Sequence, residues 1–441
     1  MKVSEIAKVI NGKILWLKKD KIISSFYTDS RNIKKGDIFW ALKGKRFDGN
    51  DFVEEAIEKG SSGIITSRKI TSDNIKKLDF CILVKDTLFA LHKLAAYHIK
   101  RCNTKNISIT GSNGKTTTKE MIRTVLSTYK PTIYNRGNFN NEYGLPLSVL
   151  EAEKKHKFGV FEIGASTIGE VRRLARIIKP DLAVITTIAP EHLEFFKTMR
   201  NIFKTETEVI EELKKNGKII INGDNHYLKR LKKNKNVISF GFSDSNDLII
   251  QFDHTKAIFC FNGKNYSIKL KNHVRHNYLN AAAAFLAGKI MGVEIRNIIS
   301  SLEKFEGVPL RMQFIKRHNS TIILDAYNAN PQSMELALNE ISSKGDFGAI
   351  LGDMKELGKY SEKYHIELAK KILETKPKML FLVGPEIKPC YDFLKGKIKN
   401  VKYYYDTNSA LNDVRIAIKK NSNLNFLIKA SRSMEFEKFI L

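Results

Sequence analysis

The chain has 441 residues and a formal net charge of +28, with 75 Lys and Arg against 47 Asp and Glu. A chain of this length exceeds the size at which one hydrophobic core keeps growing, so we expect two or three domains. The hydrophobic content of 42% excludes a disordered chain. No apolar run approaches the ~18 residues that a membrane span needs, and residues 1–6 lack the apolar block of a signal peptide.

The four cysteines are scattered and form no C-x-x-C pair, so we expect buried, reduced thiols and a cytoplasmic location. The positive charge is compatible with nucleic acid, an acidic surface or anionic substrates. Its basic clusters, such as residues 229–233, are typical of solvated helix faces, and aromatic side chains are not interleaved with them. We therefore expect no nucleic-acid partner.

In chain order, residues 1–101 predict a small α/β unit, with helices over 52–59 and 88–99 and a strand over 63–66. Residues 106–290 then alternate short apolar strands with amphipathic helices, which favours a mostly parallel sheet. The expected strands there are 158–163, 182–187 and 218–222, and the expected helices are 168–178 and 281–290. A break at 307–309 precedes a third α/β segment with strands at 322–325, 348–352, 379–384 and 425–428. We predict α/β domains at 1–101, 102–309 and 310–441.

A glycine-rich turn follows the β-branched run at 107–109 and leads into a helix-like stretch. Such a turn directs backbone N–H groups and a helix N-terminus at phosphate oxygens. Lys115 is expected at the β/γ-phosphates and the Thr116 hydroxyl at Mg²⁺. Ile109 replaces the first glycine of the common spacing, so a shorter T-G-x-x-G-K-T form remains. We predict ATP binding by residues Thr110, Gly111, Ser112, Asn113, Gly114, Lys115, Thr116 and Thr117; the alternative is a turn that binds nothing.

Further motifs follow in a fixed order: N-x-N-N at 138–141 with G-L-P at 144–146, E-I-G-A-S at 162–166, P-E-H-L-E at 190–194, and H-N-Y-L-N at 276–280. The most discriminating are D-A-Y-N-A-N-P-Q-S-M at 325–334 and L-G-D-M-K-E-L-G at 351–358. Together with the phosphate loop they resemble the Mur ligase family of ATP-dependent amide-bond-forming enzymes. The resemblance extends over the whole chain, and it implies a Rossmann-like C-terminal domain, Mg²⁺ as cofactor and a monomer.

The resemblance implies a ligase of peptidoglycan synthesis that adds D-alanyl-D-alanine to UDP-MurNAc-tripeptide through an acyl phosphate. An alternative is a ligase of the same family that adds an earlier amino acid, or a folylpolyglutamate synthase. A distant alternative is a basic P-loop ATPase that binds nucleic acid. The segment at 325–334 and the N-terminal domain argue against the first two, and the missing nucleic-acid motif argues against the third.

By the same resemblance, Glu162 and His192 are catalytic residues, as is Lys115. Both are also expected to bind the metal together with Thr116. A carboxylate such as Glu162 suits this role because Mg²⁺ prefers carboxylate oxygens. For Glu162 the alternative is a solvated carboxylate at a strand edge. For His192 it is a structural histidine, or one that reaches the metal through water. The family carries a carbamylated lysine beyond this histidine, where the present chain has Glu206. We expect Glu206 to replace it, and the alternative is a carbamylated Lys204.

The resemblance also assigns nucleotide contacts to His276, Asn277 and Asn280 near the base, Arg311 at the phosphates and Asp325 at the ribose. The alternative role for both asparagines is helix N-capping. Arg311 is also a catalytic candidate, and the alternative is that it is a surface residue in an interdomain hinge. The remaining assignments concern the other substrates. They place Ser30, Arg31, Lys43 and Asp48 at the UDP group, Asn138 and Asn141 at the muramoyl part, and Asn328 and Asn330 at the incoming dipeptide or at a closed interface.

Overall fold

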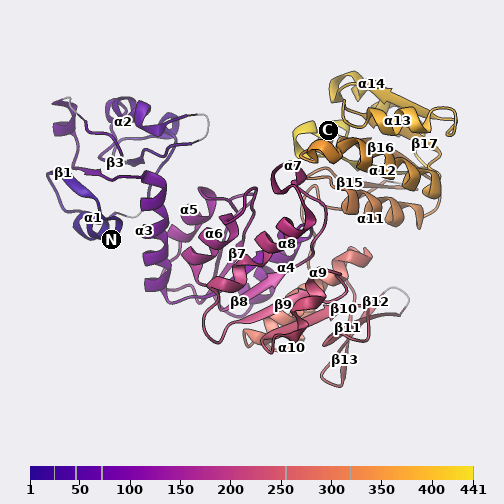
Figure 1. Ribbon diagram of the computed structural model, residues 1–441, viewed down its shortest axis with the longest axis horizontal. Coiled ribbons are helices and arrows are strands. Elements are labelled where there is room, and N and C mark those ends of the chain that lie inside the picture. Colours follow the sequence, from indigo (N-terminus) through magenta and orange to yellow (C-terminus); the bar gives the residue numbers. More distant parts are fainter. Residues whose placement is uncertain (24, 45–46, 71–72, 254–255, 318, 441) are drawn as a thin grey trace. The chain divides into compact units, whose positions relative to one another are not determined.

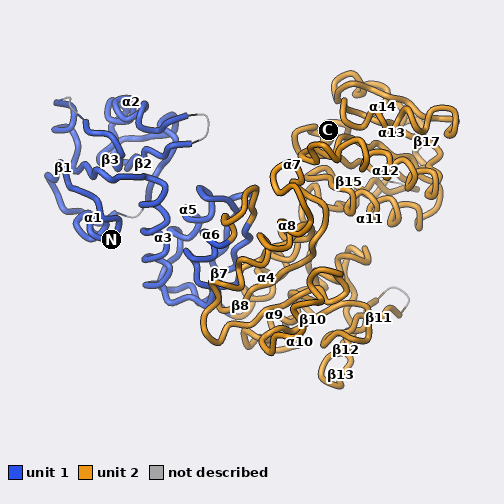
Figure 2. The backbone as a smooth tube through the Cα atoms, viewed as in Figure 1, with its two compact units in different colours: residues 1–107, 130–163, 172–180 blue, residues 108–129, 164–171, 181–441 orange. Residues whose placement is uncertain are grey.

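The computed structural model describes residues 1–23, 25–44, 47–70, 73–253, 256–317 and 319–440. The chain divides into two compact units (Figure 2). Unit 1 comprises residues 1–107, 130–163 and 172–180, and unit 2 comprises residues 108–129, 164–171 and 181–441. Within the described residues, none of the helices combines the length and the apolar character needed to cross a membrane.

Unit 1 begins with α1 (Val3–Ile10; Figure 1). A four-stranded sheet in the order β1-β4-β3-β2 follows. Its strands are β1 (Lys13–Leu17), β2 (Ile38–Trp40), β3 (Gly63–Thr66) and β4 (Phe80–Leu83). Strands β2, β3 and β4 are parallel, and β1 is antiparallel to β4. Because successive side chains of a strand alternate between faces, Ile38 and Trp40 pack with α1 and α3 (Thr87–Cys102), whereas Phe39 packs with α2 (Val53–Glu58).

Strand β5 (Lys105–Thr110) is shared by the two units. In unit 1 the strand order is β5-β7-β6, with β6 (Thr132–Tyr134) parallel to β7 (Phe158–Glu162), and α5 (Gly144–Leu150) packs on α3. In unit 2 the order is β5-β8-β9-β10-β11-β12-β13. The strands β8 (Leu182–Ile185), β9 (Lys218–Asn222), β10 (Val237–Gly241) and β11 (Leu248–Asp253) are parallel.

The edge of this sheet in unit 2 is antiparallel, because β12 (Lys256–Phe261) and β13 (Lys264–Ile268) follow β11 as hairpins. Helix α4 (Lys115–Ser127) packs on α9 (Arg275–Ile290) and α10 (Ile295–Glu303). The remaining helices before α9 are α6 (Glu170–Ile178), α7 (Leu193–Phe196) and α8 (Met199–Thr207). The expected mostly parallel sheet is therefore present, with an antiparallel addition that the sequence analysis missed.

The last part of unit 2 is a six-stranded sheet in the order β14-β15-β19-β16-β17-β18. Its strands are β14 (Gln313–Lys316), β15 (Thr321–Asp325), β16 (Phe347–Gly352), β17 (Met379–Val383), β18 (Val401–Tyr404) and β19 (Asn425–Lys429). All neighbours are parallel except β14 and β15. The helices of this part are α11 (Pro331–Ser342), α12 (Ser361–Thr375), α13 (Lys388–Leu394) and α14 (Thr407–Lys420).

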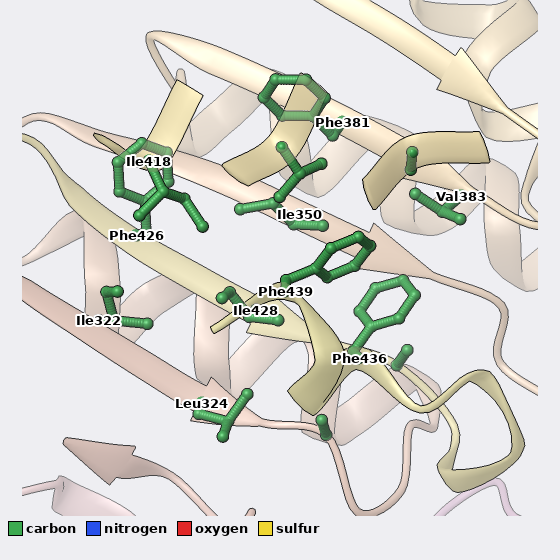
Figure 3. Packing of buried hydrophobic residues seen from close by; sticks show 14 of the residues in the cluster. Ile322, Leu324, Ile350, Phe381, Val383, Ile418, Phe426, Ile428, Phe436 and Phe439 are labelled. Atoms are coloured by element: carbon green, nitrogen blue, oxygen red, sulfur yellow. The ribbon is translucent and has the colours of Figure 1, made fainter. Parts of the chain in front are cut away.

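One face of this sheet forms a buried core with α14 and the 3₁₀ turn Phe436–Phe439 (Figure 3). The alternate residues of three strands share this face, as period two requires: Ile322 and Leu324, Phe381 and Val383, and Phe426 and Ile428. The intervening residues, such as Ile323 and Leu427, are also buried. Both faces of these strands are therefore covered, which explains their continuous apolar sequences.

The expected helices α3 and α6 and the expected strands of both large sheets are confirmed within a few residues, whereas α9 begins at Arg275 and not at the expected residue 281. The expected helix at 52–59 is shorter, because residues 49–52 form a 3₁₀ turn before α2. Cys81, Cys102 and Cys390 are buried free thiols as expected, whereas Cys260 is only partly buried.

Candidate active site

The glycine-rich loop connects β5 to α4 in unit 2. Gly111 and Gly114 have φ of 116° and 83°, where only glycine is unstrained. A Cβ on Gly111 would lie 2.4 Å from Thr186 Oγ1, and one on Gly114 would lie 2.5 Å from Asn280 Oδ1. Thr118 N–H donates to Gly114 O at 2.9 Å, so α4 presents the preceding N–H groups at its N-terminus. This arrangement favours an anion in front of the loop.

The segment after β8 supports this loop from behind. Ser112 Oγ donates to Ala189 O at 3.0 Å and accepts from Ala189 N–H at 2.8 Å. Thr186 Oγ1 donates to Asn113 O at 2.6 Å. The Ser112 side chain was expected to contact the nucleotide, and here it connects the loop to the backbone of Ala189.

Lys115 folds over the loop, where its Nζ donates to Gly111 O and to Ser112 O. Its Nζ also lies 3.6 Å from Oε1 of Glu191, a side chain only 3% exposed. An ammonium at this position between the loop and a helix N-terminus suits the charge of a polyphosphate. Thr116 and Thr117 occupy the first turn of α4 beside it and are largely buried.

Glu206 lies in α8 directly beneath the loop. Its Oε2 accepts from Gly111 N–H at 2.6 Å, while Thr110 Oγ1 donates to Glu206 O at 3.0 Å. Burial raises the pKa of this carboxyl, with the Glu191 charge acting in the same direction and Lys115 against it. Lys204 lies in the same helix but is exposed, since two residues turn a helix by more than half a circle.

Glu162 ends β7 in unit 1 and is 2% exposed, so the solvated-edge alternative is wrong. Its Oε1 accepts from Asn140 Nδ2 at 2.8 Å. The Asn135 side chain accepts from Glu162 N–H at 2.9 Å and donates to Glu162 O at 2.8 Å. Its Oε2 is buried with no hydrogen-bond partner among the residues that the structure describes. A buried carboxylate oxygen without a donor is costly unless a cation pairs with it, which fits a hard metal ion.

His192 precedes α7 and has a left-handed φ of 48°. Its Nδ1 contacts Oε2 of Glu356, and its Nε2 lies 4.0 Å from Oε2 of Glu191. Burial lowers the pKa of His192, but the hydrogen bond to Glu356 and the charges of Glu191 and Glu356 outweigh it, so the pKa lies above its ordinary value. The same hydrogen bond lowers the pKa of Glu356.

Over the described parts of the chain, three or more His, Cys, Asp or Glu side chains do not come together in a metal-binding arrangement. Oxygen ligands nevertheless suit Mg²⁺, which commonly keeps several waters and takes only one or two carboxylates. The unpartnered oxygen of Glu162 in unit 1 and the hydroxyl of Thr116 in unit 2 are each a type of ligand that Mg²⁺ binds.

Asn277 and Asn280 lie inside α9, whose N-cap is Val274, so the alternative of a helix-capping role for these asparagines is wrong. Asn280 Oδ1 accepts from Thr118 Oγ1 at 3.2 Å, and its Nδ2 donates to Asn277 Oδ1 at 3.3 Å. Asn280 therefore connects α9 to the helix that follows the phosphate loop. His276 precedes them, and burial lowers its pKa to about 4, with Lys429 contributing in the same direction against Asp325.

Arg311 opens the last part of the chain and is partly buried rather than a fully exposed surface residue. Its guanidinium lies 4.0 Å from the ring centroid of Tyr327, and its Nε is buried without a hydrogen-bond partner among the described residues. Asp325 Oδ1 accepts from Met312 N–H at 3.1 Å, and its Oδ2 pairs at 2.5 Å with Lys429, which is 1% exposed. Asp325 is thus part of a buried ion pair.

Asn330 caps α11 and contacts the phosphate loop. Its Oδ1 accepts from Ser333 N–H at 2.9 Å. Its Nδ2 donates to Asn113 Oδ1 at 2.8 Å, and Asn113 Nδ2 donates to Asn330 Oδ1 at 3.3 Å and to Gln332 Oε1 at 3.0 Å. Asn328 is exposed, and its carbonyl accepts from Lys429 Nζ at 3.0 Å. The structure therefore places Asn330 at an interface with the loop.

The residues predicted to hold the UDP group lie in unit 1. Ser30 is buried and donates to Glu55 Oε2 at 3.1 Å. Arg31 forms an ion pair with Asp29 at 2.7 Å. The hydrogen bond from the Arg31 side chain lowers the pKa of Asp29 to about 2. Lys43 and Asp48 form an isolated antiparallel bridge, and the Asp48 carboxylate pairs with Arg68 at 2.7 Å.

The two asparagines predicted at the muramoyl part are also in unit 1. Asn138 is exposed. Asn141 Oδ1 accepts from Gly144 N–H at 2.9 Å and so supports the start of α5. In the same segment Tyr143 Oη donates to Lys43 O at 3.2 Å, which connects it to the Lys43–Asp48 turn.

Sequence reasoning missed four residues that the structure places at these sites: Asn140, Glu191, Glu356 and Lys429. Three of them lie within motifs quoted above, so their position in those motifs was a usable signal. Lys429 is the last residue of the short strand β19 and had no such signal.

Comparisons with known proteins agree with this geometry. Residues 23–98 match the "Mur ligase family, catalytic domain", residues 109–288 the "Mur ligase middle domain" and residues 310–431 the "Mur ligase, glutamate ligase domain". The UDP-N-acetylmuramoyl-tripeptide–D-alanyl-D-alanine ligase of Bacillus subtilis (strain 168) is 34% identical, with 99% of this chain and 97% of that protein aligned. The ligase of the same name from Rickettsia prowazekii is 33% identical and covers 93% of both chains.

Two solved structures are similar over most of the chain. A MurF crystal structure from Acinetobacter baumannii has a TM-score of 0.88 at 30% identity, covering 99% of this chain and 97% of its own. The MurF ligase of Thermotoga maritima in complex with ADP has a TM-score of 0.82 at 29% identity, covering 94% and 96%. With its three-domain α/β architecture, its phosphate loop and this similarity along almost its full length, the chain belongs to the Mur ligase family.

Proposed function

We propose that this protein is an ATP-dependent ligase that joins D-alanyl-D-alanine to UDP-N-acetylmuramoyl-tripeptide, the activity that the relatives from Bacillus subtilis and Rickettsia prowazekii carry in their names. The observation that carries the proposal is the phosphate loop at the N-terminus of α4, in a chain that aligns with those ligases over 93–99% of its length. The motif at 325–334 supports this member of the family over its siblings.

The reaction needs ATP because a carboxylate does not acylate an amine without activation. The terminal carboxylate of the tripeptide attacks the γ-phosphorus of ATP, ADP leaves, and an acyl phosphate forms. The amine of D-alanyl-D-alanine then attacks the acyl carbon. The tetrahedral intermediate collapses with loss of phosphate and a proton, which leaves the new amide bond.

Catalysis of the first step is mainly positioning and stabilisation of phosphate charge. The N–H groups at the start of α4 and the Lys115 ammonium are oriented for this purpose. Glu191 lies near Lys115 and holds its charge at the loop. Glu206 holds the loop through the hydrogen bond from Gly111 N–H.

Mg²⁺, when bound, neutralises charge on the phosphate oxygens and holds them in line for transfer. We propose that Thr116 and Glu162 hold it, with His192 nearby, and that Glu206 takes the place of the carbamylated lysine. The burial of Glu206 and the exposure of Lys204 support Glu206. The nucleotide contacts of His276, Asn277, Asn280, Arg311 and Asp325 remain predictions, as do the contacts to the other substrates.

We further propose the domain boundaries 1–101, 102–309 and 310–441, a monomer, and a cytoplasmic location where ATP and the nucleotide-linked substrate occur together. We also propose that the domains close during the reaction, because closure excludes water from an acyl phosphate that would otherwise hydrolyse.

The proposal is tested by phosphate release with ATP, Mg²⁺, UDP-MurNAc-tripeptide and D-alanyl-D-alanine, omitting one component at a time. We expect release to need all four and to match a pentapeptide product by mass. Turnover with a single amino acid in place of the dipeptide would assign the chain to a sibling ligase. Release that needs neither acceptor would leave an ATPase and overturn the proposal.

A pair of variants separates Glu206 from Lys204. We expect Glu206→Gln to abolish activity and Lys204→Arg to retain it, because only the first changes the buried carboxylate. Loss of activity in Lys204→Arg, with bicarbonate-dependent activity and added mass on Lys204 in the natural chain, would reverse the assignment.

A further inference from the structure

A contact between two distant loops of unit 2 has no place in the chemistry described so far. His192 Nδ1 lies against Glu356 Oε2, although 164 positions separate the two residues. Two further bonds accompany it: Glu194 N–H donates to Glu356 O at 2.9 Å, and Tyr360 Oη donates to Lys197 O at 3.3 Å. The loop after β16 is therefore docked on α7 at several points.

Both partners of this contact have strained backbones. His192 has φ of 48° and Glu356 has φ of 64°, in the left-handed region that residues with a Cβ rarely adopt. Each such residue costs on the order of 1 kcal/mol or more, and it persists only where its surroundings hold it. Two strained residues that face each other indicate that the structure maintains this particular juxtaposition.

The chemistry of imidazole gives the contact a consequence. A carboxylate at Nδ1 favours the tautomer with its proton on Nδ1, which leaves a lone pair on Nε2. The Nε2 atom faces the Glu191 side of the phosphate loop, 4.0 Å from Glu191 Oε2. Histidines that serve a metal commonly need such a carboxylate to fix ring orientation and tautomer.

We propose that Glu356 is a positioning residue for His192: it fixes the imidazole tautomer and directs Nε2 at the phosphate loop. Because Glu356 lies in the last domain and His192 in the central one, His192 is oriented only while the loop after β16 is docked on α7. The inference about catalysis rests on the proposed function, whereas the inference about the tautomer does not.

The test uses the full chain with ¹⁵N-labelled histidine, observed by long-range ¹H–¹⁵N NMR at about pH 9, well above the ordinary His pKa of about 6.5. His192→Asn identifies the signal. In the natural chain we expect Nε2 to be the unprotonated nitrogen. Glu356→Ala should move the proton to Nε2, the tautomer that free imidazole side chains prefer, whereas Glu356→Gln should retain much of the original tautomer through its amide oxygen. Glu362→Gln, an exposed change in α12, is the matched control and should change nothing.

Kinetics provide the second measurement. Glu356→Ala should lower kcat by roughly 10- to 100-fold, as loss of an outer partner of a metal-linked histidine does. The KM for the UDP substrate should stay unchanged, because the residues predicted to bind it lie in unit 1. An unchanged tautomer in Glu356→Ala would overturn the proposal whatever the activity, since the contact would then be docking alone. A shifted tautomer in a chain with no ligase activity would support the positioning role while the proposed function fails.

Discussion

The buried ion pair between Asp325 and Lys429 allows a quantitative test of the C-terminal sheet. The two residues are register partners on the parallel strands β15 and β19. Lys429 is 1% exposed, and its other acceptor is the carbonyl of Asn328 at 3.0 Å. Among the described residues, Asp325→Ala would leave the buried ammonium with that one neutral acceptor.

Removing one partner of a buried pair costs about 3–5 kcal/mol, because the remaining charge stays desolvated. At 1.4 kcal/mol for each factor of ten, amide exchange that proceeds by opening of these strands should accelerate by about two to four orders of magnitude. Replacing both partners, as in Asp325→Ala with Lys429→Met, should recover most of the loss because no buried charge remains.

The measurement is hydrogen exchange by mass spectrometry on peptides covering β15 and β19, without nucleotide. Tryptophan fluorescence would not report this region, since both tryptophans, Trp16 and Trp40, are in unit 1. Asp346→Ala is the control, because Asp346 pairs with Lys378 at 3.7 Å with 73% and 62% of their side chains exposed. Exposed ion pairs contribute about 0–1 kcal/mol to the free energy of unfolding, so this control should change exchange little. An acceleration below tenfold in Asp325→Ala, or a double variant no better protected, would refute the reasoning.

Three further changes test the site. Glu162→Gln should raise the Mg²⁺ concentration for half-maximal phosphate release by at least roughly tenfold, and an unchanged Mg²⁺ titration would contradict the metal assignment. Asn330→Ala should destabilise α11 by about 1 kcal/mol for the lost cap, measured as faster exchange in residues 331–342. His276, with a folded pKa of about 4 against the ordinary 6.5, binds its proton more weakly in the folded state. Stability should therefore fall as pH decreases from 6.5 to 4, and His276→Asn should flatten that decline in urea titrations; an equal slope in both would exclude His276 as its source.

The phosphate loop and the strands around it were predictable because each carries a local signal. A β-branched run marks β5, two glycines mark positions of positive φ, and Lys115 begins a helix. The strands of the C-terminal sheet are continuous apolar segments buried on both faces, which is the strongest pattern that a parallel sheet offers.

The antiparallel edge of the sheet in unit 2 was missed although a signal exists. Asn262 and Gly263, with φ of 50° and 71°, form the tight turn between β12 and β13. An Asn-Gly pair between two apolar runs is a strong hairpin signal. The runs themselves are short and interrupted by lysines, so the pattern of hydrophobic residues alone did not reveal them.

The start of α9 was also misplaced, for a different reason. The helix was expected over 281–290, but it begins at Arg275, and the preceding Val274 makes no side-chain cap. Tertiary contacts override the local preference here, since Asn280 bonds to Thr118 in α4. The contact of His192 with Glu356 could not be predicted from the sequence, because it depends on how two loops dock and not on either sequence segment.

The side-chain amide of Asn330 has two roles: it caps α11, and it bonds to Asn113 in the phosphate loop. Aspartate caps helices as well as asparagine does, so α11 alone would tolerate either residue. Only an amide returns a hydrogen bond to Asn113 Oδ1, and a carboxylate would add negative charge beside a loop built for anions. A measurement of α11 alone would therefore score the two residues alike, whereas the contact with the loop and the binding of a nucleotide would distinguish them.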